Sequence, residues 1–314
     1  MAEKIERKPD VSVVVVVYNI PKEAPRTLHS LSAAYQRSID PDDYEVIVVD
    51  NGSTPPVEQQ LIDGLSGNFR LIRIDQGHPS PAQALNRGLA EARGDIIGVM
   101  IDGARMVTPG LLHFARHGAR LYDKAVVATL GWYLGPDFQW RSMESGYDRA
   151  REDALLASIE WPTDGYRLFE IGSMDESSVD GWFKPIAESN ALFLRREFWD
   201  MLGGLDERFD APGGGLLNLD TYNRAIEWPD AQLVVLLGEA TFHQLHGGTN
   251  TNKPLVRQHD NWTHWGAQYA NIRGRPYETA RPTDPPTCLG TVPRPMLARF
   301  TRAVQQLEQP PIAP

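Results

Sequence analysis

The sequence contains one cysteine, Cys288, in 314 residues, so it can form no internal disulfide and no zinc site built from cysteines. Cysteine this scarce is typical of a protein kept in a reducing compartment. The sequence also lacks a run of about 18 to 20 apolar residues, the length a helix needs to cross a bilayer. Residues 1–8 carry charges of both signs, unlike a signal peptide. We therefore expect a cytoplasmic protein with no integral membrane segment.

Positive charge is also in short supply. The 31 Lys and Arg residues are outnumbered by 41 Asp and Glu, which leaves a net charge of −10. A surface for nucleic acid needs an excess of basic side chains, so a nucleic-acid partner is not expected. A small anionic ligand needs only a local pocket and stays allowed. The ordinary share of hydrophobic residues, 41%, predicts a globular protein with a real core.

The first third of the chain alternates β-branched apolar runs with helical patterns. This order predicts an α/β fold with a mostly parallel central sheet flanked by helices. Strands are expected at residues 11–18, 44–49, 69–74 and 95–101, and helices at 26–35 and 81–92.

Polar side chains follow three of these strands. Because ligands of parallel sheets bind at the carboxyl ends of the strands, we expect three segments to meet at one edge. They are Tyr18–Asn19, Asp50–Ser53 and Asp102–Arg105.

The second part of the chain is less regular. Residues 131–181 follow no clear period and carry several aromatic side chains, which suit either an acceptor groove or anchors to the core. From Thr249 the sequence is rich in Pro and Arg, and we expect it to wrap the surface as a C-terminal extension. Between these parts we expect helices at about 110–122, 196–202 and 219–226, strands at 125–130, 190–195 and 234–237, and a flexible loop at 212–215.

Five short motifs occur in order along the chain. They are VSVVVVVYN from Val11, DNGS from Asp50, ALNRGLAEARGD from Ala84, GGLDERF from Gly203 and DTYNR from Asp220. In this arrangement the sequence resembles the GT-A fold glycosyltransferases of the family 2 type.

The resemblance implies a division of the chain and an activity. Residues 1–110 would hold the nucleotide of the donor, residues 111–250 would form the acceptor-binding and catalytic half of the same GT-A domain, and residues 251–314 would be the extension. The implied activity is transfer of a sugar from a nucleoside diphosphate sugar, with UDP as the expected nucleotide, to a saccharide or glycoconjugate acceptor, with a role in polysaccharide biosynthesis. Whether the protein is an oligomer stays open.

The resemblance also assigns the donor site. Asp50 would contact the base and ribose, since a carboxylate accepts paired hydrogen bonds from an imide or from hydroxyl groups. A simple capped turn would have the same sequence. The other donor-binding candidates are Tyr18, Asn19, Asn51, Gly52, Ser53, Asn86, Asp102 and Arg105.

Asp102 falls at the first position of the family's Asp-x-Asp metal motif, but the second position is Ala104. In the family, the second acid binds Mg²⁺ or Mn²⁺, which offsets charge on the leaving diphosphate. Two alternatives could take the place of this second acid. Asp102 could bind the metal with His243 or His246, which we favour, or Arg105 could neutralise phosphate charge.

The sequence also departs from the family at the position of the catalytic base. An inverting transferase needs a carboxylate that takes the proton of the acceptor hydroxyl. The family supplies it from a Glu-Asp pair, whose positions here are Leu217 and Asn218. We predict Asp220 as the base, with Glu188 and Asp206 as further candidates. Asp220 could equally cap its helix and pair with a basic residue four positions on, Arg224.

These departures leave two alternative functions open. A retaining transferase of the same fold would not need the missing base. A non-catalytic subunit that binds a nucleotide sugar or glycan would need neither the base nor the metal acid. A nicotinamide dehydrogenase is disfavoured, because residues 18–24 lack the glycine fingerprint of that class.

Overall fold

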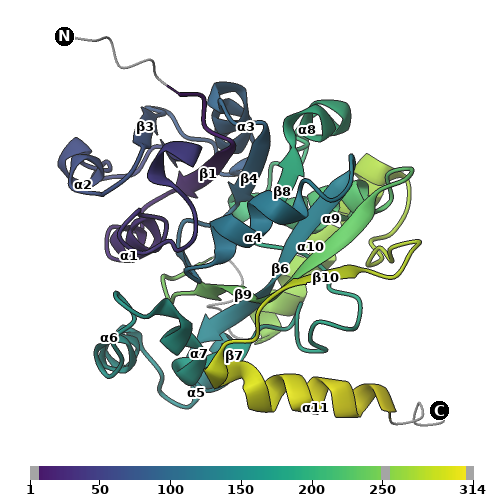
Figure 1. Cartoon of the computed structure of the whole chain (residues 1–314). Helices are drawn as coiled ribbons and strands as arrows, with labels where there is room; N and C mark the ends of the chain where they lie inside the picture. Colours follow the sequence, from purple (N-terminus) through teal and green to yellow (C-terminus); the bar gives the residue numbers. More distant parts are fainter. Residues whose placement is uncertain (1–6, 249–254, 309–314) are drawn as a thin grey trace.

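The protein, described here by a computed structural model for residues 7–248 and 255–308, is built on one curled, mixed sheet with helices on both faces (Figure 1). Its first half is parallel: β1 (Val11–Val17) lies between β2 (Tyr44–Asp50) and β4 (Ile96–Met100), and β3 (Phe69–Arg73) pairs with β2. Every residue of β1 and β2 is buried. Runs of Val and Ile suit such strands, because both faces are covered by helices.

Three helices connect these strands: α1 (Glu23–Ser30), α2 (Gln59–Asp63) and α3 (Ala82–Glu91). Alternate residues of β1 pack on opposite sides, since Val14 shares a core with Leu85 of α3 and Val15 shares another with Leu28 of α1. The α/β fold predicted from the sequence is confirmed, and the boundaries of β1 to β4 lie within one residue of those expected.

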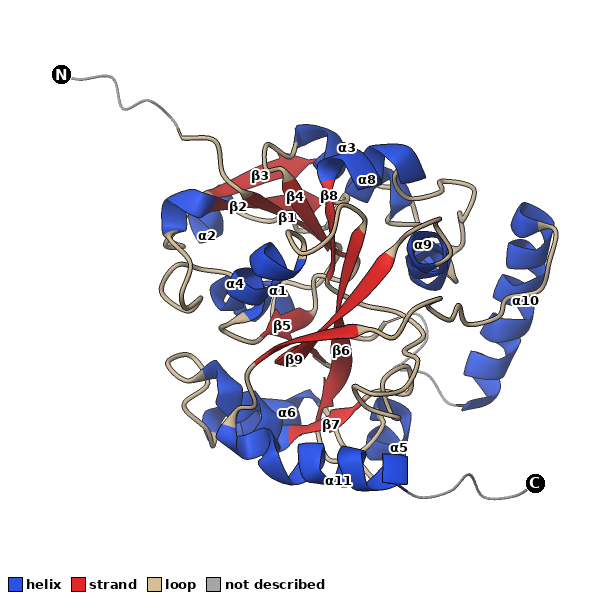
Figure 2. Ribbon diagram, turned by 45° about the vertical axis from the view of Figure 1, so that its right-hand side comes forward, coloured by secondary structure: helices blue, strands red, loops and turns tan. Residues whose placement is uncertain are grey.

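The second half of the sheet mixes directions. The order across the sheet is β10-β9-β6-β8-β4-β1-β2-β3, with β5 paired to β9 and β7 paired to β6 (Figure 2). β8 is antiparallel to β4 and β6, whereas β6, β9 and β10 are parallel to one another. The strands are β5 (Arg105–Val107), β6 (Ala125–Leu134), β7 (Gly172–Met174), β8 (Leu192–Arg195), β9 (Gln232–His243) and β10 (Thr287–Gly290).

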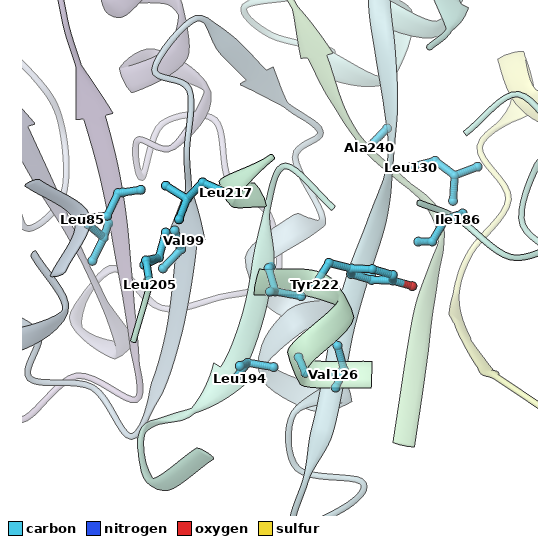
Figure 3. Packing of buried hydrophobic residues seen from close by; sticks show 14 of the residues in the cluster. Leu85, Val99, Val126, Leu130, Ile186, Leu194, Leu205, Leu217, Tyr222 and Ala240 are labelled. Carbon is cyan, nitrogen blue, oxygen red and sulfur yellow. The ribbon is translucent and has the colours of Figure 1, made fainter. Parts of the chain in front are cut away.

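The remaining helices cover this half. Figure 3 shows Leu205, Leu217 of α9 and Val99 of β4 close to Leu85 of α3, so the two halves share one core. Among the described helices, none has the length and apolar character that crossing a membrane would demand. The helices are α4 (Leu111–Gly118), α5 (Gln139–Glu144), α6 (Arg149–Ala157), α7 (Leu168–Ile171), α8 (Arg196–Leu202), α9 (Leu217–Ile226), α10 (Leu255–Arg273) and α11 (Leu297–Glu308), with short 3₁₀ turns at residues 41–43, 165–167, 212–214 and 294–296.

Two segments are more ordered than their sequences suggest. Residues 131–181 extend β6 and add α5, α6, α7 and β7, and their Trp132 is fully buried against Phe169 and Phe242. Its aromatic side chain thus anchors the core. The C-terminal segment does more than wrap the surface: it adds β10 to the sheet and buries Trp265 and Met296. Prolines are frequent between these elements and interrupt the hydrophobic pattern, so the sequence does not reveal the helices and the strand.

Asp220 joins α9 to α10 at the edge of this core. It is fully buried, and its carboxylate accepts hydrogen bonds from Arg224 Nε at 3.0 Å and from Arg273 Nε and Nη2 at 2.5 and 2.6 Å. Arg273 also pairs with Asp206 at 2.8 Å. One buried carboxylate therefore pairs with arginines on two neighbouring helices.

We expect Asp220→Ala to lower the free energy of unfolding by about 3 kcal/mol, because it removes the buried carboxylate that two partly buried arginines share. Urea denaturation followed by circular dichroism measures this value. Asp123→Ala is the matched control, since Asp123 is 99% exposed and its pair with Arg195 spans 3.5 Å. Its expected loss is below about 0.5 kcal/mol. Equal losses for both variants would contradict this role for Asp220.

Candidate functional site

A cavity of about 570 Å³ opens at the carboxyl ends of β1, β2 and β4. The loops predicted to meet at this edge do so: Tyr18 and Asn19 follow β1, Asn51 follows β2, and Asp102 and Arg105 follow β4. All five residues line the cavity. The opposite wall is contributed by later segments of the chain. Its lining residues include Glu188, Asn190, residues 212–219 in part, His243, His246, Trp262 and Trp265.

Asp50 shapes one of these loops from beneath. Its side chain is 1% exposed, Oδ1 accepts the Ser53 N–H and Oδ2 accepts the Val57 N–H, both at 2.9 Å. Ser53 Oγ in turn accepts the Asn19 N–H at 3.0 Å. The structure thus shows the capped turn that the sequence allowed. Asp50, Gly52 and Ser53 do not line the cavity, so their contact with a nucleotide stays a prediction.

Asn86 also has a structural role, because it connects α3 to the loop after α8. Its Oδ1 accepts the Leu205 N–H at 2.9 Å, and its Nδ2 donates to the Leu205 carbonyl at 2.9 Å and to Glu207 Oε1 at 2.8 Å. A Cβ on Gly204 would lie 2.7 Å from Asn86 Oδ1, which explains the glycine there. Two of the five sequence motifs therefore meet in one contact, away from the residues that line the cavity.

Asp102, His243 and His246 bring their ligand atoms together within 4.8 Å. Asp102 Oδ2 lies 2.9 Å from His243 Nε2 and 3.5 Å from His246 Nε2, and the two Nε2 atoms are 3.1 Å apart. The sheet creates this meeting, because Arg105 of β5 pairs with His243, the last residue of β9. The structure thus brings together the three residues predicted to hold a metal.

The hydrogen bonds of His243 indicate whether these three side chains are suited to binding a cation. His243 Nδ1 donates to Gln139 Oε1 at 2.8 Å, while Gln139 Nε2 donates to the His243 carbonyl at 3.3 Å. Burial and the nearby Arg105 lower the pKa of His243 to about 4, despite the opposing effect of Asp102. The ring is therefore neutral near pH 7, and its Nε2 lone pair faces a carboxylate oxygen. A proton on His246 can satisfy both the His243 Nε2 lone pair and the Asp102 oxygen. A divalent metal ion can do the same.

Asp102 and His246 shift the pKa of each other in opposite directions. Burial raises the pKa of Asp102, but His246 and His243 outweigh it and hold this pKa well below its ordinary value. For His246, burial lowers the pKa and Asp102 more than compensates, so the pKa is raised. Asp102 is also fixed by the Ala104 N–H, which donates to Oδ1 at 2.9 Å. An ionised carboxylate and two imidazoles form a suitable donor set for a metal.

Arg105 lies beside this group. It is 5% exposed, with Nε 3.9 Å from Asp102 Oδ2 and Nη1 3.7 Å from Asp175 Oδ2. Neither nitrogen has a hydrogen-bond partner among the described residues. A buried guanidinium with free donors at a cavity wall is suited to an anionic oxygen of a ligand.

Helix α6 holds the loop that carries His246. Arg149 donates to the Leu245 carbonyl at 3.1 Å and to the His246 carbonyl at 2.8 Å. Glu152 accepts the Leu245 N–H at 2.9 Å, and burial raises its pKa to about 7. The segment that the sequence left unassigned therefore positions one of the candidate metal ligands.

Glu188 is the carboxylate on the far wall of the cavity. Its Oε2 accepts a hydrogen bond from Asn218 Nδ2 at 2.6 Å, and its Oε1 lies 3.4 Å from Asn190 Nδ2. Burial raises the pKa of Glu188, and Asp175 adds to this effect while Arg105 and Asn218 oppose it. Asn218 stands at a position where the family carries an acid. The structure thus places a different carboxylate, Glu188, next to that position.

The other two acids named as bases lie elsewhere. Asp220 is enclosed by Arg224 and Arg273 and does not line the cavity, so the geometry favours an ion-pair role over the predicted role as base. Its helix pairing with Arg224 was the alternative that the sequence allowed. Asp206 is bound by Arg208 and Arg273, and the hydrogen bond from Arg208 lowers its pKa. Neither acid is placed to accept a proton from a ligand in the cavity.

Several lining residues were missed from the sequence. His78 follows β3, and its Nδ1 accepts the Ser80 N–H at 3.1 Å. The run of turn residues after a strand could have signalled it. Trp262 and Trp265 of α10 had no such signal, because they lie in a segment without a recognised motif.

The comparisons agree with this geometry. The model of the family described as Glycosyl transferase family 2 matches residues 12–163, a little less than half of the chain. A search of the curated proteins found no significant match.

Solved structures share the fold at low identity. GalNAc-T7 with UDP, GalNAc and Mn²⁺ is 16% identical, with 87% of this chain and 52% of that chain covered and a TM-score of 0.51. TarS 1-349 of S. aureus is 15% identical, with 83% of this chain and 66% of that chain covered and a TM-score of 0.47. This chain thus spans about half to two thirds of their length. Residues 12–163 thus match the glycosyl transferase family 2 model, and the mixed α/β sheet of the chain is similar to the fold of GalNAc-T7.

Proposed function

We propose that this protein transfers a sugar from a uridine diphosphate sugar to a saccharide or glycoconjugate acceptor, with inversion at the anomeric carbon. The observation that carries the proposal is one cavity that joins the strand-end loops, the Asp102 group and the Glu188 carboxylate. The similarly folded GalNAc-T7 is described with UDP, GalNAc and Mn²⁺, which supports this donor class. A cytoplasmic location and a role in polysaccharide biosynthesis stay predictions.

The donor would lie along the loops of the first half. Tyr18 is 57% exposed and lines the cavity with Asn19 and Asn51, so its ring is free to pack on a nucleobase. Arg105 would donate to a phosphate oxygen, because two of its nitrogens have no hydrogen-bond partner among the described residues. This arrangement directs the diphosphate toward Asp102.

Asp102 Oδ2 and the Nε2 atoms of His243 and His246 would hold a divalent metal ion. We propose Mn²⁺ over Mg²⁺, since two imidazoles are poor ligands for the harder magnesium ion. When bound, such an ion supplies positive charge that stabilises a leaving diphosphate. The two histidines would thereby replace the acid missing at Ala104.

Glu188 is the proposed base. Its carboxylate would take the proton from an acceptor hydroxyl as that oxygen forms a bond to the anomeric carbon. The bond from this carbon to the diphosphate oxygen breaks, and its electron pair leaves with the nucleotide. Asn218 would orient the carboxylate through its 2.6 Å hydrogen bond. A retaining enzyme or a non-catalytic subunit would not need this acid in the cavity.

The metal proposal predicts that His243→Ala weakens Mn²⁺ binding by about 10- to 100-fold or more, since it removes one ligand of three. Isothermal titration calorimetry with MnCl₂ measures the affinity. The control is His117→Ala, which removes an exposed histidine on α4. We also expect EDTA to abolish release of UDP from UDP-sugars, with recovery on adding Mn²⁺. Equal Mn²⁺ affinity in both variants would refute the ligand set.

The base proposal predicts that Glu188→Gln lowers kcat by about 10²- to 10⁴-fold while the affinity for UDP stays within about twofold. The base works only when ionised, so activity is present above its pKa and is lost as the pH falls through it. Because this pKa is raised, we expect the acid limb of the kcat profile above the ordinary value of about 4.3.

Glu160→Gln is the control for this experiment, since Glu160 is exposed and outside the cavity. NMR of the product would show inversion at the anomeric carbon. Retained activity in Glu188→Gln would count against this base, and a retained configuration would favour the retaining alternative. UDP binding without any turnover by the unmodified protein would favour the non-catalytic subunit.

A further inference from the structure

Helix α10 supplies an aromatic wall to the same cavity. Trp262 and Trp265 of this helix line it together with Glu188 and Gly215. All four lie outside residues 12–163, the part that the family model matches. Figure 2 shows α10 beside α9 at the edge of the molecule, so this wall is built by the C-terminal half of the chain.

The position of this wall is fixed by several contacts. Arg273 at the end of α10 binds Asp220, and Gln268 donates to Asp210 Oδ1 at 2.6 Å. Trp265 is 7% exposed, and a Cβ on Gly215 would lie 2.9 Å from its Cδ1 atom. The glycine loop at the cavity therefore rests directly on the Trp265 ring. Trp265 is an anchor that holds loop and helix together.

Trp262, one turn earlier, has a different environment. It is 41% exposed, and its ring meets Trp265 at 6.3 Å and Tyr277 at 6.5 Å between centroids. These neighbours support the indole ring while part of it remains open toward the cavity. A large apolar ring held exposed beside polar groups is a feature of binding pockets, where the ring provides area and the polar groups fix orientation.

We propose that Trp262 is the stacking platform for the acceptor sugar. The apolar C–H face of a pyranose ring packs on the open indole face, and its hydroxyl groups remain free for polar partners. Glu188 in the same cavity is the carboxylate available to one of these hydroxyls. This assignment rests on the proposed function and adds to it the acceptor class, a pyranoside, and the residue that recognises it.

The test uses the full chain and simple pyranosides as ligands. Saturation-transfer difference NMR is recorded with millimolar methyl β-glucopyranoside, methyl β-galactopyranoside and methyl N-acetyl-β-glucosaminide, each with and without UDP and Mn²⁺. We expect signals from the ring protons of at least one glycoside with the unmodified protein. Trp262→Ala should weaken its binding by about tenfold or more, and Trp262→Phe should keep part of it.

His264→Ala is the matched control, because His264 is exposed on the same helix and does not line the cavity. It should bind the glycoside as the unmodified protein does. The platform is refuted if no glycoside binds the unmodified protein, or if Trp262→Ala binds it equally well. Thermal unfolding of each variant shows whether a loss of binding reflects a loss of fold.

UDP affinity, measured on the same variants, separates this proposal from the donor proposal. We expect it to be unchanged in Trp262→Ala, because the donor contacts lie on the loops after β1, β2 and β4. If UDP fails to bind the unmodified protein, the proposed transferase function falls. The sugar signals recorded without UDP still decide whether Trp262 is a saccharide platform.

Discussion

The site depends on one electrostatic constraint: the partly buried Asp102 carboxylate must be balanced by groups that come from the other half of the sheet. Pairing of β5 with the end of β9 brings His243 to 2.9 Å from it, and the following turn adds His246. Because an isolated charge at this depth would be strongly unfavourable, the contact ties the two halves together. The cavity wall and the orientation of Arg105 follow from this junction.

Acidic residues of this chain divide into two physical classes. Asp50 and Asp220 have both carboxylate oxygens occupied by backbone N–H groups or arginines, and they order loops and helices. Asp102 and Glu188 line the cavity and keep capacity for a ligand. The motif acids at Asp50 and Asp220 thus stabilise loops and helices outside the cavity, whereas Asp102 and Glu188 line it.

The two parts of the chain contribute different walls to the cavity. The part matched by the family model, residues 12–163, supplies the loops after β1, β2 and β4. Later segments supply Glu188, Asn218 and the tryptophans of α10. Residues 131–181 also contribute to the site, because Arg149 and Glu152 of α6 form hydrogen bonds with the loop that carries His246. Regions without a motif thereby complete a site that the motifs begin.

The sequence by itself determined the α/β fold, the positions of the first four strands along the chain and the edge at which their loops meet. These features depend on local periodicity and on the direction of parallel strands, which neighbouring residues encode. It also singled out Asp102, His243 and His246. Only the tertiary structure decided that Asp220 is neutralised by Arg273, that Glu188 lies next to Asn218, and that α10 faces the cavity. These outcomes depend on contacts between residues 30 or more positions apart, which no local pattern records.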